Sequence, residues 1–327
     1  MKAVWYSQTG PARQVLMCGE QPDPEPKAGE VRVRLRVSGV NPSDVKSRAG
    51  ARGPLTFPLQ IPHSDGAGVI DRVGAGVASE RVGERVYLWN AAWGRPMGTC
   101  GQFVSLPAEQ AVALPEGTDF AFGACLGIPV MTACHAVLAD GPVEKQMVLV
   151  TGGAGNVGRY AIQLAKWSGA RVIATVSGAE KAAVARDAGA DLVINYRTDD
   201  VIERVLAFTA GLGVDRVVEV EFGGNLAITK QVLKTAGVIA AYGSMADRTP
   251  VLPFYELMFK HATLRMLLVY SLSDAQRRAV VRAITNALRD GALSPLIGAR
   301  FALDESAQAH EAVESGMLIG HVLIDIP

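Results

Sequence analysis

A glycine-rich stretch, Val150–Gly158 with the sequence VTGGAGNVG, has the residue types and spacing that point most directly to chemistry. From Gly153 it fits the pattern G-x-G-x-x-G, in which glycines let a chain turn tightly beneath a dinucleotide pyrophosphate. Gly153 would permit the turn, Gly155 would let the backbone approach a phosphate, and Gly158 would let the following helix lie close to its sheet. The alternative is a tight strand-to-helix turn that binds nothing.

The segments around this stretch favour the nucleotide interpretation. MVLVT before it is a continuous apolar strand, and NVGRYAIQLAKWSG after it has the spacing of an amphipathic helix. From about Gly123 onwards, strand-like and helix-like segments alternate, which predicts a parallel sheet covered by helices. A helix that begins near Asn156 would direct its first amide groups and the positive end of its dipole at the pyrophosphate.

The next predicted strand, in RVIATVSGAEK, ends without the acidic residue that usually binds the ribose hydroxyls of NAD. Ser177 stands there, and Lys181 follows one turn into the next helix. A hydroxyl group together with a cation suits the 2′-phosphate of NADPH. The alternative is that Ser177 and Glu180 form a capping box, S-x-x-E, while Lys181 is only solvated.

Residues 1–117 have a β-rich texture with little that looks helical. In EVRVRLRVSGV, valine and leucine alternate with arginine, so Val31, Val33, Leu35 and Val37 would share one face of a strand. After about Ser271 the pattern predicts one long helix, a strand, a short helix and a last strand, HVLIDI. We expect this tail to pack back on the N-terminal half.

The composition excludes several classes of protein. The chain has 327 residues, of which 49% are hydrophobic, enough for two domains with cores of their own. The formal net charge is zero, which argues against nucleic acid or an anionic membrane as the main partner. No apolar run is long enough to cross a bilayer, and no signal-peptide core is present. The four scattered cysteines are expected as buried thiols, and the protein is expected in the cytoplasm.

Together these segments resemble the zinc-free quinone oxidoreductases, the zeta-crystallin branch of the medium-chain dehydrogenase/reductase superfamily. The similarity covers nearly the whole chain and is carried by SGVNPSDVKSRAG, GAGVIDRVGAGV with VGERV, LGIPVMTACHAVL, the glycine stretch, AGADLVINYR and AHEAVESG. It implies an α/β fold with a GroES-like β-rich catalytic domain and a Rossmann-type, doubly wound parallel-sheet cofactor domain. Residues 1–122 and 271–327 would form the first domain, and residues 123–270 the second.

The resemblance also implies roles for single residues. Asn41 and Thr132 would be the catalytic residues, beside the nicotinamide of NADPH. Gly155, Asn156 and Val157 would lie along the pyrophosphate. The full set that would bind the cofactor is Asn41, Thr132, Gly152, Gly153, Gly155, Asn156, Val157, Ser177, Lys181, Tyr196, Gly243, Ser244 and Val269. Of these, Ser177, Lys181 and Tyr196 would surround the adenosine phosphate.

Four places depart from the family pattern. Lys46 stands where an aromatic residue is common, and His63 replaces a glycine in PHSD. The triplet at 220–222 (VEF) replaces the more usual Asp-x-Val, and Gly320-His321 replaces the closing Gly-Lys. Because the first three would border the acceptor or the cofactor, the resemblance leaves the fine substrate specificity open.

The resemblance bears on metal chemistry as well. Zinc-dependent relatives use a cysteine in the first segment and a His-Glu pair in the second, whereas Asn41, Ser64 and Asp65 stand here. Asparagine and serine are poor zinc ligands, and the chain has no cysteine-rich segment for a structural zinc. His63 and the pair Cys134-His135 are more simply explained as structural or core residues. We therefore expect no metal site.

Without a metal, the oxidation of simple alcohols lacks its usual means of stabilising an alkoxide. A quinone accepts hydride without that help, and an enone accepts it where donors stabilise the enolate. The predicted function is therefore NADPH-dependent quinone reduction, in which Asn41 orients a flat acceptor and Asp44 supports the loop. The alternatives are an NADPH-dependent enone (alkene or enoyl) reductase, or a non-catalytic, crystallin-like protein that holds NADPH or binds RNA.

The resemblance and two apolar segments point to self-association. Relatives of this branch are commonly dimers. VIAAYGS and ATLRMLLVYS are apolar strands that would favour pairing with a second copy if they lay at a sheet edge. We therefore expect a homodimer.

Overall fold

The computed structural model describes residues 1–327 and divides the chain into two compact units. The first unit combines Met1–Ile128 with Pro295–Pro327, and the second unit is Pro129–Ser294. Helix α10 (Asp274–Arg289) groups with the second unit, whereas the expected boundary at residue 271 placed it in the first. The division into a catalytic and a cofactor domain stays a prediction.

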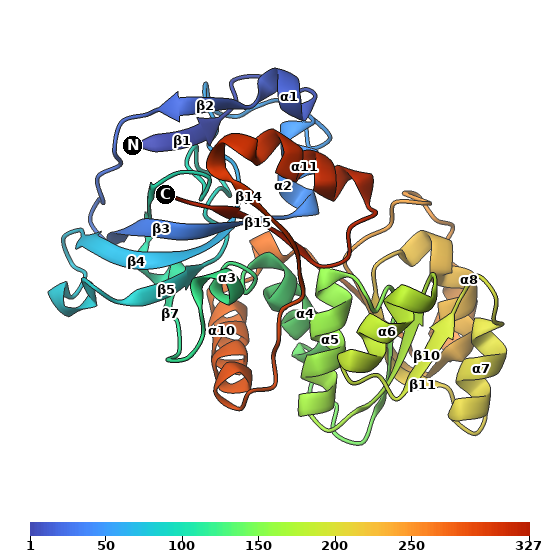
Figure 1. Cartoon of the computed structure of the whole chain (residues 1–327). Coiled ribbons are helices and arrows are strands. Elements are labelled where there is room, and N and C mark those ends of the chain that lie inside the picture. The colour runs from blue at the N-terminus through green and yellow to red at the C-terminus, as the bar shows by residue number, and fades with distance from the viewer. The chain divides into compact units, whose positions relative to one another are not determined.

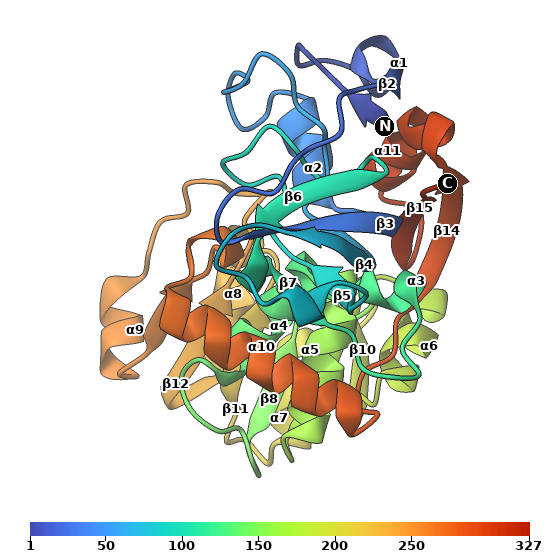
Figure 2. The ribbon, with the colours of Figure 1, turned by 90° about the vertical axis from the view of Figure 1, so that its left-hand side faces the viewer.

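The first unit is built around a sheet in the order β14-β15-β3-β4-β5-β7, and β6 also pairs with β3 (Figure 1, Figure 2). Its strands are β3 (Glu30–Val40), β4 (Asp65–Val73), β5 (Arg85–Leu88), β6 (Phe103–Pro107), β7 (Ala111–Ala113), β14 (Ile297–Ala302) and β15 (His321–Asp325). A separate antiparallel pair consists of β1 (Lys2–Trp5) and β2 (Met17–Glu20). The helices are α1 (Ala12–Val15), α2 (Pro42–Arg48), α3 (Phe120–Gly123) and α11 (Ser306–Ser315).

The alternation of residue types along β3 explains its central place in this sheet. Val31, Val33 and Leu35 are at most 1% exposed, so this face enters the core as the sequence predicts. Arg32 departs from the predicted pattern, because its side chain is buried too. Its guanidinium donates to Asp71 at 2.7 Å and lies 4.8 Å from the centre of the Phe103 ring. The ion pair and the aromatic ring thus offset the burial of this charge.

The C-terminal tail returns to the first unit through its strands and its last helix. β15 pairs antiparallel with β3, with Val322 opposite Val40, and β14 pairs parallel with β15. Between these strands α11 packs against α1 and α2. The expectation of little helix before residue 117 is wrong for α2, which begins at Pro42 because proline suits the first turn of a helix.

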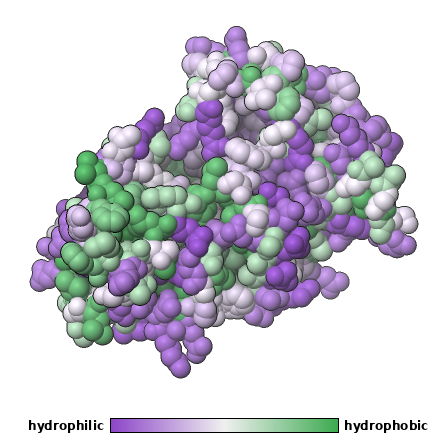
Figure 3. All heavy atoms as spheres, turned by 180° about the vertical axis from the view of Figure 1, so that it is seen from behind, coloured by the Kyte–Doolittle hydropathy of each residue, from purple (hydrophilic) through white to green (hydrophobic).

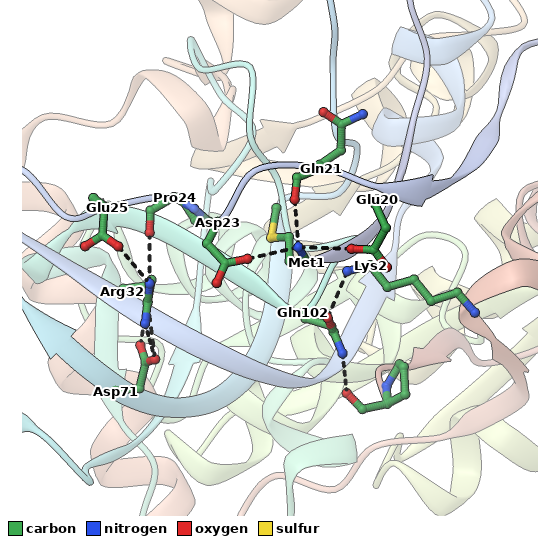
Figure 4. A network of polar contacts seen from close by, with 11 residues as sticks. Met1, Lys2, Glu20, Gln21, Asp23, Pro24, Glu25, Arg32, Asp71 and Gln102 are labelled. Carbon is green, nitrogen blue, oxygen red and sulfur yellow. Dashed lines mark hydrogen bonds and ion pairs between the residues drawn. The ribbon is translucent and has the colours of Figure 1, made fainter.

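Figure 4 shows the polar contacts that hold the start of the chain in the first unit. The ammonium group of Met1 donates to the Gln21 carbonyl at 2.7 Å and pairs with Asp23 at 2.9 Å and Glu20 at 3.3 Å. The hydrogen bond to Asp23 is the main reason why the pKa of this ammonium group is raised. The start of the chain is therefore fixed to the segment that follows β2.

The second unit is a sheet of six parallel strands in the order β10-β9-β8-β11-β12-β13. Its strands are β8 (Met147–Val150), β9 (Arg171–Val176), β10 (Leu192–Asn195), β11 (Val214–Glu219), β12 (Leu233–Ala241) and β13 (Thr263–Met266). Its helices are α4 (Ile128–Leu138), α5 (Asn156–Trp167), α6 (Ala179–Asp187), α7 (Val201–Phe208), α8 (Phe222–Val232), α9 (Phe254–Phe259) and α10. Counted along the unit, the strand order is 3-2-1-4-5-6, the doubly wound arrangement.

The face of the sheet on which each helix lies follows from the direction in which the chain crosses this sheet. α5 packs against α6, and α7 packs against α8 (Figure 1). The direction of crossing reverses after β10, so right-handed connections put the two helix pairs on opposite faces. Ligands of such sheets bind at the carboxyl ends of the strands where the order reverses, which here is the end of β8 beside β9 and β11.

The edges of the second sheet are β10 and β13. VIAAYGS forms part of β12, whose residues Val238–Ala241 pair with β13, so this segment lies inside the sheet. ATLRMLLVYS supplies the edge strand β13. In α9, which precedes β13 in the sequence, Phe254, Tyr255 and Phe259 are more than half exposed. Figure 3 shows a broad hydrophobic area on the face seen from behind. The homodimer stays a prediction.

Two features of composition are settled by the fold. None of the helices combines the length and the apolar character that a membrane-spanning segment needs. Cys100, Cys125 and Cys134 are buried thiols as predicted, and burial raises the pKa of Cys100 to about 12. Cys18 lies on β2 and is exposed, so the expectation of burial is wrong for this residue.

Candidate functional site

The glycine loop joins β8 to α5 at the reversal point of the second sheet. Gly152 has a φ of +65°, in the left-handed region, so the tight turn depends on this glycine and not on Gly153 as predicted. Gly153 is needed for space instead, because a Cβ there would lie 2.8 Å from the Cβ of Ala174 on β9. A Cβ at Gly158 would lie 2.2 Å from the carbonyl oxygen of Gly152, so this glycine lets α5 begin close to the loop that follows β8.

Gly155 is the residue that precedes α5, and it leaves the start of the helix open. It is exposed, has an extended backbone, and provides no side chain to cap the first amide groups of α5. The atom nearest to a Cβ added at Gly155 would be the Gly152 carbonyl oxygen, at 3.4 Å. Asn156 and Val157 supply the first helical amides. An anion could therefore approach this helix end without displacing a side chain.

Sequence reasoning missed Glu219, which links this loop to the end of β11. Glu219 is fully buried, and its Oε1 accepts hydrogen bonds from Thr151 Oγ1 at 2.7 Å and from Asn225 Nδ2 and the Glu221 backbone at 2.8 Å. Burial raises the pKa of Glu219, and these hydrogen bonds oppose the rise. The signal in the sequence is an acidic residue at the end of the apolar strand VDRVVEV. Glu219 thereby links the glycine loop, through Thr151, to the segment after β11, through Glu221.

The residues expected around the adenosine phosphate lie at the ends of two neighbouring strands. Ser177 follows β9, Tyr196 follows β10, and Tyr196 N–H donates to the Val176 carbonyl at 3.1 Å. α6 begins after Gly178 without a side-chain cap, so the alternative of a Ser177–Glu180 capping box is wrong. The second unit thus brings Ser177 and Tyr196 together, and it places Lys181 in the first turn of α6. Their role toward a phosphate stays a prediction.

The residues expected near the nicotinamide in the second unit follow β12 or are buried. Gly243 and Ser244 lie in the loop after β12, where the Ser244 hydroxyl accepts from Gly223 N–H at 2.9 Å. This hydroxyl also donates to the Asp247 carbonyl, so the fold itself occupies it. Thr132 on α4 and Val269 are at most 5% exposed. Their contact with a nicotinamide stays a prediction.

Glu221, which departs from the family pattern, clamps the loop after β12. Its carboxylate accepts from the backbone N–H groups of Met245 at 2.7 Å and Ala246 at 3.0 Å. Phe222 N–H donates to the Gly243 carbonyl at 2.9 Å beside this clamp. Both carboxylate oxygens of Glu221 therefore hold backbone.

Asn41 lies in the first unit, where it precedes α2 and contacts two buried carboxyl groups. Its backbone N–H donates to Asp44 Oδ2 at 2.8 Å, and its Nδ2 donates to Asp65 Oδ2 at 2.7 Å. Ile128 N–H lies 2.9 Å from both oxygens of Asp65. Burial raises the pKa of Asp44 to about 7 and that of Asp65 well above its usual range. Asp44 thus supports the start of α2, as predicted.

His63 forms part of a buried polar chain in the first unit. Its Nδ1 lies 2.9 Å from Ser38 Oγ, and its Nε2 lies 2.9 Å from Nε2 of His310 on α11. Burial lowers the pKa of His63 well below its ordinary value and that of His310 to about 3. His63 has a φ of +77°, in the left-handed region that favours glycine, the residue that the resemblance leads us to expect there. Its role is structural, as the sequence favoured.

Comparisons with known proteins agree with this geometry. The alcohol dehydrogenase GroES-like domain matches residues 27–116, and the zinc-binding dehydrogenase family matches residues 156–286. The 2-haloacrylate reductase of a Burkholderia species is 31% identical over 333 residues, which cover 99% of this chain and 98% of the relative. The quinone oxidoreductase of Sus scrofa is 29% identical over 292 residues, 89% of this chain and 87% of the relative. A mycobacterial structure complexed with NADPH has a TM-score of 0.87 at 27% identity, covering 99% of this chain and 100% of that one.

The 2-haloacrylate reductase match extends from end to end of both chains and decides the family. This chain belongs to the quinone oxidoreductase branch of the medium-chain dehydrogenase/reductase superfamily. It is therefore an oxidoreductase of the NAD(P)H-dependent kind, with a GroES-like β-rich domain and a Rossmann-type parallel sheet. The family and fold class predicted from the sequence are confirmed.

The match to the zinc-binding dehydrogenase family raises the question of a zinc site. The residues present do not fit this metal. Among Asn41, Ser64 and Asp65 only the aspartate is a good ligand, and its oxygens already accept from Ile128 and Asn41. No group of three His, Cys, Asp or Glu side chains lies close enough to hold a metal ion. Cys134 packs against α10, with Sγ 3.9 Å from the Val280 carbonyl oxygen.

The openness of the glycine loop gives a first testable prediction. Gly155→Val should abolish NADPH binding, because a branched side chain would occupy the space at the start of α5 that a pyrophosphate needs. The fold should survive, since the φ of −73° at this position suits any residue and the nearest atom is 3.4 Å away. Cofactor fluorescence measures binding, and circular dichroism checks the fold. Gly158→Val is the contrasting variant, which should lose the fold itself. Wild-type binding by Gly155→Val would move the phosphate elsewhere.

The histidine pair gives a prediction about pH. Because the pKa of both histidines is lower in the folded state, the unfolded chain takes up protons first as the pH falls below about 6.5. The pair therefore stabilises the fold above that pH and loses this contribution below it, by up to about 1.4 kcal/mol per pH unit for each histidine. Urea unfolding at pH 7 and pH 5 should show a larger loss in the wild type than in His63→Gly/His310→Asn. Equal losses would contradict the assignment.

Proposed function

We propose that this protein reduces quinones with NADPH, without a metal. The observation that carries the proposal is that the carboxyl group of Asp65 accepts hydrogen bonds from Asn41 and Ile128. Asp65 stands at the place where zinc-dependent relatives have a ligand pair. Simple alcohols need a metal or a strong base to form an alkoxide, whereas quinones accept hydride without either. The quinone oxidoreductase of Sus scrofa supports this acceptor class by its similarity over most of both chains.

The residues of the second unit fit a dinucleotide. The uncapped start of α5 after Gly155 would receive the pyrophosphate on the amides of Asn156 and Val157. Ser177 and Tyr196, which lie at neighbouring strand ends, would hold the adenosine phosphate together with Lys181. Bound NADPH would supply the hydride. The mycobacterial structure complexed with NADPH, similar over its whole length, supports this choice of cofactor.

In the first unit, Asn41 would orient the acceptor from its fixed place before α2. Its burial at 5% exposure and its contacts with Asp44 and Asp65 restrict the side chain to few conformations. The protein would then act mainly by positioning and by excluding water. A second candidate function is reduction of an activated alkene, favoured by the 31% identity with the 2-haloacrylate reductase.

An acceptor panel tests the proposed function. The purified protein should oxidise NADPH with ortho- or para-quinones, keep this activity in a chelator, and fail to oxidise simple alcohols with NADP⁺. Absorbance of NADPH gives the rates, and elemental analysis gives the zinc content. Faster turnover of α,β-unsaturated ketones than of any quinone would favour the second candidate. Alcohol turnover above both, or about one zinc per chain, would refute the proposal.

Cofactor choice gives a separate prediction. Lys181→Glu should remove most of the preference for NADPH over NADH in kcat/KM, because one charge-assisted contact with the 2′-phosphate contributes about 1–3 kcal/mol. Arg186→Glu is a matched control, since it makes the same change of charge at an exposed place later on α6. A wild type that prefers NADH, or an equal effect of both variants, would contradict the phosphate assignment.

A further inference from the structure

The side chains of Asn41 and Asp65 meet where β3 ends and β4 begins. Gly39 of β3 lies opposite Asp65 in the antiparallel register, and Asn41 follows two residues later, directly before α2. Nδ2 of Asn41 donates to Oδ2 of Asp65 at 2.7 Å, and both residues are at most 5% exposed. Two neighbouring strands therefore fix the distance between the amide and the carboxyl group.

The hydrogen bond between these side chains has one direction. Ile128 N–H lies 2.9 Å from each oxygen of Asp65, and a backbone N–H can only donate. Oδ2 of Asp65 accepts from Nδ2 of Asn41, so Asn41 turns its NH₂ group toward Asp65. The amide oxygen therefore points away from Asp65. Without such a neighbour, the two ends of an asparagine amide would be interchangeable in shape.

The chain leaves no room for the carboxyl group to move away. A Cβ at Gly127 would lie 2.0 Å from Oδ1 of Asp65, and a Cβ at Gly39 would lie 2.4 Å from the Ala124 carbonyl oxygen. Backbone therefore lies against the carboxyl group at Gly127, and the β3 strand approaches the following segment closely at Gly39. This packing is what a fixed hydrogen-bond partner requires.

The charges near Asp65 agree with a carboxyl group solvated by neutral donors. Its titratable neighbours are Asp44, which raises the pKa of Asp65, and Cys125, whose pKa Asp65 raises in turn. Arg52 acts on Asp44 and lowers its pKa. No cation forms an ion pair with Asp65, so Asn41 and Ile128 supply the hydrogen bonds that water would otherwise supply.

We propose that Asp65 is a positioning residue that sets which end of the Asn41 amide is presented to the acceptor. The proposal rests on the proposed function, in which Asn41 orients the acceptor. Asp65 acts only through Asn41 in this role. A carboxylate at residue 65 forces one orientation of the amide, and a donor at residue 65 forces the reverse.

The variant Asp65→Asn reverses the hydrogen bond without changing the size of the side chain. Its oxygen still accepts from Ile128 N–H, but its NH₂ group faces Asn41, which must then turn its amide oxygen inward. We expect kcat with a quinone to fall by about tenfold or more, because Asn41 would then present its NH₂ group where the wild type presents its amide oxygen, and groups positioned against that oxygen would be displaced. The Kd for NADPH should change by less than about twofold, because the phosphate-binding candidates lie in the second unit.

Asp44→Asn is the matched control for this test. It also removes a buried carboxyl group beside Asn41, but its amide oxygen can still accept from the backbone N–H that Asp44 now binds at 2.8 Å. The kcat of this variant should stay within about threefold of the wild type, since the carboxyl group of Asp65 still accepts from Nδ2 of Asn41. An equal fall of kcat in both variants would overturn the proposal.

The side-chain amide of Asn41 gives a readout that needs no activity. Its ¹⁵N–¹H signal is identified by its loss in Asn41→Ala, and in the wild type one NH₂ proton should be shifted downfield and protected from exchange. Asp65→Asn should lose this signature while thermal unfolding confirms the fold. A solvent-like amide signal in the wild type, or an unchanged kcat in Asp65→Asn, would overturn the proposal. A wild type that reduces no quinone would refute the proposed function alone, and the amide signal would still decide the role of Asp65.

Discussion

Each unit of this protein buries one carboxyl group at a strand end, and neither group has a cation as partner. Hydrogen-bond donors of the protein replace the water that would otherwise surround each carboxyl group, and the candidate site in each unit depends on those donors. Glu219 ends β11 and accepts three donors on one oxygen, whereas Asp65 begins β4 and accepts from Ile128 and Asn41. A buried carboxylate is strongly unfavourable unless donors surround it. Every loop that supplies such a donor is therefore fixed in place, including the glycine loop through Thr151.

The glycines of the second unit extend the same constraint from side chains to backbone. A Cβ at Gly243 would lie 2.4 Å from the Val220 carbonyl oxygen, and a Cβ at Gly223 would lie 2.4 Å from the Asp247 carbonyl oxygen. The loops after β11 and β12 thus touch backbone to backbone at both glycines. Because the carboxylate of Glu221 holds two further amides of the second loop, this part of the reversal point has little freedom. Such rigidity is what a site that works by positioning requires.

Periodic features of the sequence predicted the fold well, because they depend on near neighbours in the chain. The alternation of strands and helices, the core face of β3 and the close approach at Gly158 follow from patterns within a few residues. Two differences from the expectations depend on long-range contacts. Strand order places VIAAYGS inside the sheet, and packing against α4 groups α10 with the second unit. The tight turn depends on the positive φ of Gly152. The sequence could not show which of the glycines at 152, 153 and 155 would adopt this conformation.

Long-range contacts also explain what the sequence could not reveal about the first unit. His63 and His310 are separated by 247 positions, yet their ring nitrogens lie 2.9 Å apart. Thr99 Oγ1 donates to the Asp65 carbonyl at 2.6 Å, so Ser38 must donate to Thr99, and His63 must donate to Ser38. His310 Nε2 then donates to His63, and His310 Nδ1, at the end of this series of hydrogen bonds, has no hydrogen-bond partner.

This chain of donors ends on the carbonyl of the residue whose carboxyl group holds Asn41. Asp65 is therefore fixed through its main chain by the Thr99 hydroxyl and through its side chain by Ile128. A non-glycine residue in the left-handed region at His63 is destabilising by about 1 kcal/mol or more, and the hydrogen bonds of the chain offset this strain. Replacing His63 by the usual glycine would relieve the strain but leave Ser38 without its donor. The histidine at residue 63 thus helps to fix Asp65, through Ser38 and Thr99 and without direct contact between the two side chains.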